Sequence, residues 1–229
     1  MGFFRRTHVW GQSPRTYELR VDSPVARGYI HPFQGQKDPR TLVMRPIVGS
    51  DHMRVDAVRR ANYQWLEPWE ATLPPENNQP FTSMAAFIRR SDRLQARSQA
   101  LFMQVQLDEE IVGQFSLSNV QWDAACMGSL GYWISAKVAG RGIGASCAAM
   151  MMDLALGELG LHRVEVCVRP ENVRSLELCR RIGLIREGLR PRYLHIAGQW
   201  ADHVAWYADQ ESMPEGGYVM ALMRARGFA

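Results

Sequence analysis

The hydrophobic and polar positions divide most of the chain into strand-like and helix-like segments. Short apolar or alternating runs predict strands at residues 41–48, 101–107, 111–117, 129–135, 162–168, 190–196 and 201–208. Helical spacing predicts helices at residues 51–62, 83–97, 144–159 and 173–182. The resulting order, β-α-α-β-β-β-α-β-α-β-β, favours an α/β or α+β layered architecture.

Local signals set the ends of these segments. Asp51 and Asn172 are suited to cap helices, and Ser83 opens the second one. Gly160 and Gly183 are suited to end helices, and Ala197–Gly198 predicts the turn of a last hairpin, with which the chain is expected to end. Prolines predict a loop at residues 66–80, and another loop is expected at residues 119–127.

Residues 1–40 differ from the rest in composition. They are rich in Gly, Pro and Arg, with strand-like pieces at residues 16–21 and 26–30. We expect an amino-terminal extension of unknown role, laid as an arm on a domain that spans residues 41–229.

Composition narrows the class of protein. The chain has 229 residues, 46% of them hydrophobic, and a formal net charge of +4, which is ordinary for a globular protein with a sizeable core. The mild positive charge fits a solvated surface or attraction to acidic partners. Four cysteines without C-x-x-C spacing predict neither a zinc site nor a disulfide framework. No apolar run is long enough for a signal peptide or a membrane span, so a cytoplasmic protein is expected.

The glycine-rich stretch AGRGIGA, residues 139–145, indicates a phosphate-binding turn of one of two kinds. Gly140, Gly142 and Ala145 fit the spacing of a dinucleotide-binding turn, and Gly142 with Gly144 fits the core of a coenzyme A diphosphate loop. Both kinds present free N–H groups at a helix start to a diphosphate. The dinucleotide interpretation would use Glu165 as the ribose ligand, but Glu165 lies inside a predicted strand rather than at its end. Three preceding strands and a final hairpin also disfavour it.

Five motifs in order, GYW, GRGIG, LGLHRVE, PENVRS and RRIGL, resemble the acetyl-CoA half of GNAT-superfamily N-acetyltransferases. The closest resemblance is to the RimJ/RimL type, which acetylates N-terminal amines of ribosomal proteins. It covers about residues 41–208 and is strongest over 131–207. One departure is Ala139, where the family's loop usually begins with Gln or Arg. The resemblance implies the GNAT fold, a mixed central sheet with helices on both faces.

The resemblance also implies a binding site for acetyl-CoA, without a metal. The diphosphate would bind to backbone N–H groups of the loop, and Ile134 would present its N–H to the thioester oxygen. Asn172, besides capping its helix, would touch the coenzyme A arm. The implied cofactor-binding residues are Trp133, Ile134, Arg141, Gly142, Ile143, Gly144, Ala145, Asn172 and Ser175. Arg141 could add charge, with a solvated loop arginine as the alternative.

For catalysis, the resemblance implies that Ser175 donates a hydrogen bond to the leaving sulfur, since Cys179 stands where many members carry a tyrosine. The alternative for Ser175 is a purely structural part in the helix cap. Glu70 is the first candidate for the base, with Glu67 behind it, although either could be a solvated loop carboxylate.

Asp202 and His203 could line the substrate cleft or form a satisfied structural pair. No cluster has metal-ligand spacing, and no Ser-His-Asp pattern appears.

The acceptor is expected to be an amine, most favourably the N-terminal Ala or Ser of a ribosomal protein. An α-amine has a pKa of about 7.7–8.0, so roughly a tenth is neutral near pH 7, whereas lysine at about 10.4 is almost wholly charged. A small-molecule amine is the alternative acceptor, and a non-catalytic acyl-CoA-binding regulatory module is the alternative class. We expect no membrane or nucleic-acid partner, and the chain could form a homodimer.

Overall fold

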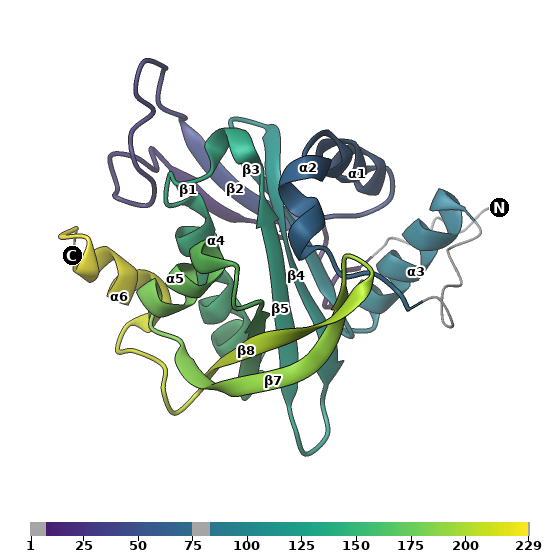
Figure 1. Cartoon of the computed structure of the whole chain (residues 1–229). Helices are drawn as coiled ribbons and strands as arrows, with labels where there is room; N and C mark the ends of the chain where they lie inside the picture. Colours follow the sequence, from purple (N-terminus) through teal and green to yellow (C-terminus); the bar gives the residue numbers. More distant parts are fainter. Residues whose placement is uncertain (1–7, 75–82, 229) are drawn as a thin grey trace.

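The computed structural model describes residues 8–74 and 83–228, and a single mixed sheet runs through this part of the chain (Figure 1). Its strands are β1 (Leu19–Asp22), β2 (Thr41–Pro46), β3 (Leu101–Leu107), β4 (Glu110–Gln121), β5 (Met127–Ile134), β6 (Arg163–Val168), β7 (Ile185–Ile196) and β8 (Gln199–Asp209). The strand order is β1-β2-β3-β4-β5-β6-β8-β7. All neighbours are antiparallel except β5 and β6, which are parallel.

Helices cover both faces of this sheet, as the family resemblance implies. They are α1 (Asp51–Ala61), α2 (Tyr63–Leu66), the 3-10 turn η1 (Glu67–Trp69), α3 (Met84–Ala96), the 3-10 turn η3 (Ala136–Val138), α4 (Ile143–Asp153), the π turn η4 (Leu154–Glu158), α5 (Val173–Arg181) and α6 (Gly217–Ala225). Figure 1 shows α1, α2 and α3 on one side and α4, α5 and α6 on the other.

Alternation along the strands divides the apolar side chains between the two faces. Leu101 and Met103 of β3 belong to the main core, which α4 and α6 complete. Phe102, between them, packs instead with Val55 of α1. The larger core therefore lies on the α4 side of the sheet, and a smaller one lies beneath α1.

Most of the local signals are confirmed. The side chains of Ser83 and Asn172 cap α3 and α5 by accepting N–H groups three residues on. Ala197 and Gly198 both have positive φ, as a two-residue hairpin turn of this kind requires. Asp51 is not the cap of α1: Ser50 precedes the helix, and the Asp51 carboxylate pairs with Arg45 and Arg54.

Five predictions about the elements are wrong. Residues 26–30 form turns instead of a strand, because Gly28 has φ of +76° and its N–H donates back to Val25. Residues 67–69 of the predicted loop form η1. The second predicted loop is shorter than expected, because only residues 122–126 lie between β4 and β5. The strand expected from residue 190 already begins at Ile185 as β7. The chain does not end in a hairpin, since α6 follows β8.

The amino-terminal arm joins the sheet. β1 pairs with β2 along its whole length, with Leu19 opposite Met44. The division of the chain at residue 41 stays a prediction. Residues 1–7 of the arm and residues 75–80 of the predicted loop lie outside the described residues.

Candidate active site

The parallel strands β5 and β6 are paired only over their first residues. Register partners join Met127 to Arg163 and Ser129 to Glu165, and in the described chain the pairing goes no further toward Ile134. β5 keeps its other neighbour, because Gly113 of β4 still lies opposite Ile134. The second half of β5 therefore has a strand edge that β6 does not cover, and such an edge can bind an extended ligand through backbone groups.

Two hydrogen bonds show which backbone groups of β5 face this uncovered edge. The N–H of Ser135 donates to a carbonyl of β4 at 2.8 Å, so Ser135 and Trp133 direct their backbone groups toward β4. The carbonyl oxygen of Ile134 instead accepts the indole N–H of Trp65 at 3.0 Å. Since the direction alternates along a strand, the N–H of Ile134 points away from β4. The Ile134 N–H thus lies on the uncovered side of β5, as its implied role of donating to the thioester oxygen requires.

The glycine-rich loop ends at the start of α4. Gly142 has φ of +80° and precedes the helix, whose first backbone bond runs from the Ser146 N–H to the Gly142 carbonyl. The N–H groups of Ile143, Gly144 and Ala145 therefore have no acceptor inside the helix. Together with the positive end of the helix dipole, they form a group that can bind phosphate.

The amino-terminal arm contacts this loop through Arg141. The His31 N–H donates to the Arg141 carbonyl at 2.8 Å, and the Arg141 guanidinium donates to the Pro32 carbonyl at 2.7 Å. The same guanidinium lies over the ring of Phe33, 5.0 Å from its centroid. Arg141 is thus fastened to residues 31–33, which corrects the alternative of a solvated loop arginine.

Arg226, just after α6, contacts the same region and was missed by sequence reasoning. Its guanidinium donates to the carbonyls of Gly28 and Tyr29 at 2.8 and 2.6 Å, and to Ser146 Oγ at 3.1 Å. Burial, and secondarily the charge of Arg181, lowers the pKa of Arg226. Among the described residues no carboxylate forms an ion pair with Arg226, so its positive charge remains beside the loop. No motif marks this residue, and the contact joins the two ends of the chain.

The helix α5 places Ser175 beside β5. The side chain of Asn172 accepts the Ser175 N–H at 3.2 Å, as its predicted cap role requires. Ser175 Oγ lies 2.6 Å from the hydroxyl of Tyr132, whose ring stacks on Phe115 with centroids 5.0 Å apart. The thiol of the buried Cys179 is also within hydrogen-bonding reach of Tyr132.

Tyr132 is a second residue that sequence reasoning missed. It lies within the GYW motif, but its proximity to Ser175 depends on the packing of α5 against β5. Burial raises the pKa of Tyr132 well above its ordinary value, so the phenol is protonated near neutral pH. Burial likewise raises the pKa of Cys179, to about 12.

The two candidate bases both have partners. The Glu70 carboxylate forms an ion pair with Arg59, and the Glu70 carbonyl accepts the N–H of Ala197 at the hairpin turn. The exposed Glu67 accepts the hydroxyl of Tyr63 at 2.5 Å. Each carboxylate therefore has a partner, and Glu67 is also exposed to solvent, as the alternative of a loop carboxylate expects. Within residues 8–74 and 83–228, no hydrogen bond or ion pair joins either of them to Ser175, so their catalytic role stays a prediction.

Asp202 and His203 lie on the hairpin without pairing to each other. The exposed Asp202 accepts the Arg192 N–H at 2.8 Å, and His203 contacts the Ala201 carbonyl through Nδ1 at 3.0 Å. Burial lowers the pKa of His203, so this imidazole is neutral near pH 7. Each side chain therefore has a structural partner of its own.

Trp133 and Glu165 were considered as ligands of coenzyme A and of a ribose, respectively, and the side chains of both have other partners. Trp133 packs its ring with Ile47 and Val55 beneath α1, so its side chain does not lie with Tyr132 on the main-core face. Glu165 accepts hydrogen bonds from Arg163 and Arg190, which occupy both of its carboxylate oxygens. A ribose ligand role for Glu165 is therefore excluded by its partners.

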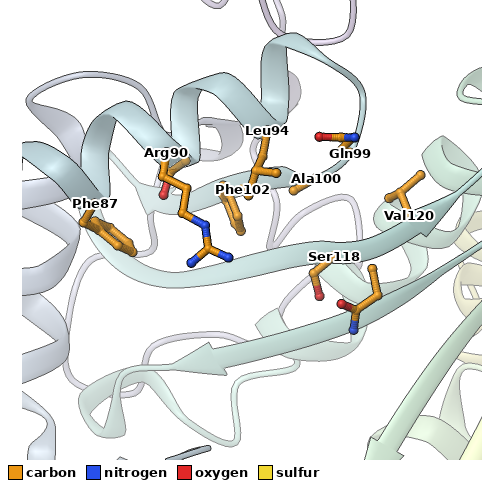
Figure 2. Close-up of a pocket in the computed structure, with 10 residues that line it drawn as sticks. Phe87, Arg90, Leu94, Gln99, Ala100, Phe102, Ser118 and Val120 are labelled. Carbon is orange, nitrogen blue, oxygen red and sulfur yellow. The ribbon is translucent and has the colours of Figure 1, made fainter. Parts of the chain in front are cut away.

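A hollow of about 420 Å³ lies at the other end of these strands, between α3 and the sheet (Figure 2). Phe87 and Arg90 of α3 and Phe102 of β3 are among its lining residues. It also includes Ser118 of β4, which lies opposite Ser129, at the far end of β5 from Ile134. The hollow thus shares no residue with the predicted site.

Neither a metal site nor a membrane-spanning helix is found among the described residues. Within residues 8–74 and 83–228, no group of three or more His, Cys, Asp or Glu side chains could hold a metal ion. None of the helices described has the length and apolar character needed to cross a membrane.

Comparison with known proteins gives the family. The family described as "Acetyltransferase (GNAT) domain" matches residues 41–185. The chain is 30% identical over 164 residues to the [Ribosomal protein uS5]-alanine N-acetyltransferase of Escherichia coli, covering 71% of this chain and 84% of that one. It is 31% identical over 96 residues to the Bacillus subtilis protein named "Probable N-acetyltransferase YjcK", 42% of this chain and 53% of that relative. The match therefore spans about half of that relative's length.

A solved structure agrees with these sequence matches. Mycobacterium smegmatis RimJ, in complex with CoA-disulfide, has 30% sequence identity and a TM-score of 0.72, covering 81% of this chain and 89% of that chain. The chain belongs to the GNAT acetyltransferases. Members of this family take their acetyl group from acetyl-CoA, so the predicted fold, enzyme class and co-substrate are confirmed at the level of the family. Membership of this family favours the coenzyme A loop over the dinucleotide turn as the interpretation of AGRGIGA, and the binding role of its residues stays a prediction.

Proposed function

We propose that this protein transfers acetyl from acetyl-CoA to the N-terminal α-amine of a ribosomal protein, with alanine or serine as the acceptor residue. The observation that carries the proposal is the separation of β5 from β6. It leaves the Ile134 N–H on the uncovered edge of β5, on a strand whose Tyr132 contacts Ser175 of α5. The similarity to the Escherichia coli uS5-alanine enzyme and to RimJ supports this class of acceptor. Such an acceptor would be met in the cytoplasm.

The residues of the loop fit the co-substrate. Ile143, Gly144 and Ala145 offer three N–H groups without helical acceptors, and Arg226 adds a positive charge beside them. Acetyl-CoA, when bound, supplies the acetyl group on a thioester sulfur. The Ile134 N–H would then donate to the thioester oxygen, where negative charge develops. The Ser175 hydroxyl would donate to the sulfur as it leaves.

An α-amine acceptor fits the 66–70 segment, whose two carboxylates already have partners. Glu70 is held by Arg59 and Glu67 by Tyr63. An α-amine needs little help, because roughly a tenth of it is neutral near pH 7, whereas an unperturbed lysine is almost wholly charged. Water can take up its proton.

The test offers the purified protein several amines with acetyl-CoA. The set holds short peptides beginning with Ala or Ser, the same peptides with a blocked N-terminus and an internal lysine, and small amines such as polyamines. Mass spectrometry identifies the acetylated species. Acetylation of the free N-terminal peptides supports the proposal. Acetylation confined to the small amines contradicts it in favour of a small-molecule acceptor, and binding of acetyl-CoA without any product favours a regulatory module.

A further inference from the structure

Tyr132 of β5 and Ser175 of α5 are in contact in the region where β5 is no longer paired with β6. Tyr132 comes from the part of β5 beyond its pairing with β6, and Ser175 comes from the first turn of α5. The Tyr132 ring is held by stacking on Phe115, with an angle of 19° between the ring planes. Ser175 is partly exposed, while Cys179, below it on α5, is fully buried. The Tyr132 hydroxyl is therefore fixed between a buried thiol and a more accessible serine.

In the hydrogen bond between Tyr132 and Ser175 either hydroxyl could be the donor, and the chemistry of the three groups favours one direction. A phenol is a stronger donor than an aliphatic alcohol, and a serine oxygen is a stronger acceptor than a thiol sulfur. Tyr132 therefore donates to Ser175 Oγ in preference to Cys179. The Cys179 thiol can in turn donate to the Tyr132 oxygen. In this arrangement the Ser175 hydroxyl donates to neither Tyr132 nor Cys179, so its proton is available to another acceptor.

We propose that Tyr132 is the positioning residue for Ser175: it donates the 2.6 Å hydrogen bond and so directs the Ser175 proton outward, toward the uncovered edge of β5. The inference rests on the proposed function, because it explains how the Ser175 hydroxyl would be oriented toward the leaving sulfur. Burial raises the pKa of Tyr132, so its hydroxyl keeps its proton near neutral pH.

In the reaction, the amine nitrogen forms its bond to the acetyl carbon, and the carbon–sulfur bond breaks with its electron pair on sulfur. The proton that the nitrogen loses passes to water, and water returns one proton to the sulfur. Ser175 contributes a hydrogen bond that strengthens as charge collects on sulfur. Tyr132 keeps its proton throughout and fixes the direction in which Ser175 donates.

The experiment compares Tyr132→Phe, Ser175→Ala and the double variant with the wild-type protein. For each protein we would measure kcat, the affinity for acetyl-CoA and Tm. Removing one positioning hydrogen bond should lower kcat about threefold to tenfold, with acetyl-CoA affinity unchanged. Because Tyr132 acts through Ser175, the double variant should turn over as slowly as Ser175→Ala and no slower.

Tyr218→Phe is the matched control. Tyr218 is a buried tyrosine of α6 whose hydroxyl bonds to Ser212, so its loss should lower Tm and leave kcat unchanged. Wild-type turnover tests the proposed function and is measured first. A defect of Tyr132→Phe in an otherwise active protein then concerns the role of Tyr132. A Tyr132→Phe protein with wild-type kcat would overturn the inference. A double variant whose loss equals the product of the two single losses would overturn it as well.

Discussion

Arg226 donates a hydrogen bond of 2.6 Å to the backbone carbonyl of Tyr29, across 197 positions of the sequence. The same guanidinium reaches Ser146 in the first turns of α4. One side chain therefore connects the amino-terminal arm, the end of the chain and the glycine-rich loop. The arm and α6 lie largely outside the matched family region, residues 41–185, yet they support the element that would bind the diphosphate.

Arg226→Ala should lower both stability and the affinity for acetyl-CoA. The variant leaves two carbonyls and one hydroxyl without their charged donor and removes a positive charge beside Gly142. A loss of about 2 kcal/mol is expected, which corresponds to a fall in Tm of about 4–8 °C for a domain of this size. Arg224→Ala is the control, because the exposed side chain of Arg224, in α6, donates a hydrogen bond to the nearby Glu215 carbonyl and, among the described residues, to no other group. Equal Tm values for the two variants would contradict the connecting role.

Gly142→Ala should reduce acetyl-CoA binding more than Gly140→Ala does. Both glycines have φ near +80°, so each substitution brings backbone strain of about 1–2 kcal/mol. A Cβ at Gly140 meets nothing within 4 Å, whereas one at Gly142 lies 3.1 Å from Arg226 Nη2 and 3.4 Å from the His31 ring. The difference between the variants therefore reports the contacts and not the strain.

The measurement for the two glycines is the rise in Tm on adding acetyl-CoA. At about 100 times the dissociation constant, the ligand stabilises the wild-type fold by about 2.7 kcal/mol, or about 5–10 °C. Gly140→Ala should keep this rise, and Gly142→Ala should lose most of it. NAD at the same concentration should shift neither protein. An equal rise in both variants would show that the loop does not need its contacts with Arg226 and His31.

The features predicted from sequence are those whose partners lie close together in the chain. Asn172 caps α5 by accepting an N–H three residues further along the chain. Ala197 and Gly198 form their turn by themselves, so the local sequence alone identifies these features. The glycine-rich loop is likewise continuous, and its position between a strand and a helix is visible in the pattern. These elements also carry most of the motifs on which the family resemblance rests.

The features that were missed depend on distant partners. The start of α6 has no side-chain cap of its own, and Asp153, at the end of α4, accepts the N–H groups of Tyr218 and Val219. Tyr132 meets Ser175 across 43 positions. Periodicity and capping rules use neighbouring residues, and they therefore give no signal for contacts that arise when separate elements pack.

Glu165→Gln should destabilise the protein near neutral pH, and the effect should shrink in acid. Burial opposes the charge of Glu165, but hydrogen bonds and charge from Arg190 and Arg163 hold its pKa below the ordinary value. A carboxyl with a lowered folded pKa stabilises the fold above its unfolded pKa of about 4.3, and this contribution is lost as the pH falls through the folded pKa. We expect a loss of about 1–2 kcal/mol at pH 7.

Urea unfolding at several pH values measures this effect. The free energies of unfolding of the wild-type and Glu165→Gln proteins should converge below pH 4. Glu187→Gln is the comparison, because Glu187 bonds to the same two arginines but is far more exposed, and its loss should cost less. A gap between wild type and Glu165→Gln that persists unchanged in acid would show that the charge of Glu165 is not the cause.

Ser175→Ala decides whether this residue takes part in the reaction or only helps to pack α5 against Tyr132. If its hydroxyl donates to the leaving sulfur, the interaction is strongest as thiolate charge develops, and kcat should fall about tenfold to a thousandfold. The affinity for acetyl-CoA should change little. The cap itself survives in this variant, because Asn172 accepts the backbone N–H of residue 175 and not its hydroxyl.

Asn172→Ala supplies the contrast on the same helix turn. It removes the cap acceptor, so it should cost about 1 kcal/mol of stability, and it should weaken acetyl-CoA binding if Asn172 also touches the coenzyme. Measuring kcat, acetyl-CoA affinity and Tm for both variants under identical conditions separates the two roles. A Ser175→Ala enzyme with near-native turnover and reduced stability would assign Ser175 to the packing of α5 against Tyr132. The leaving-group donor would then have to be sought elsewhere, and the protonated Tyr132 hydroxyl is the group that the structure places next to it.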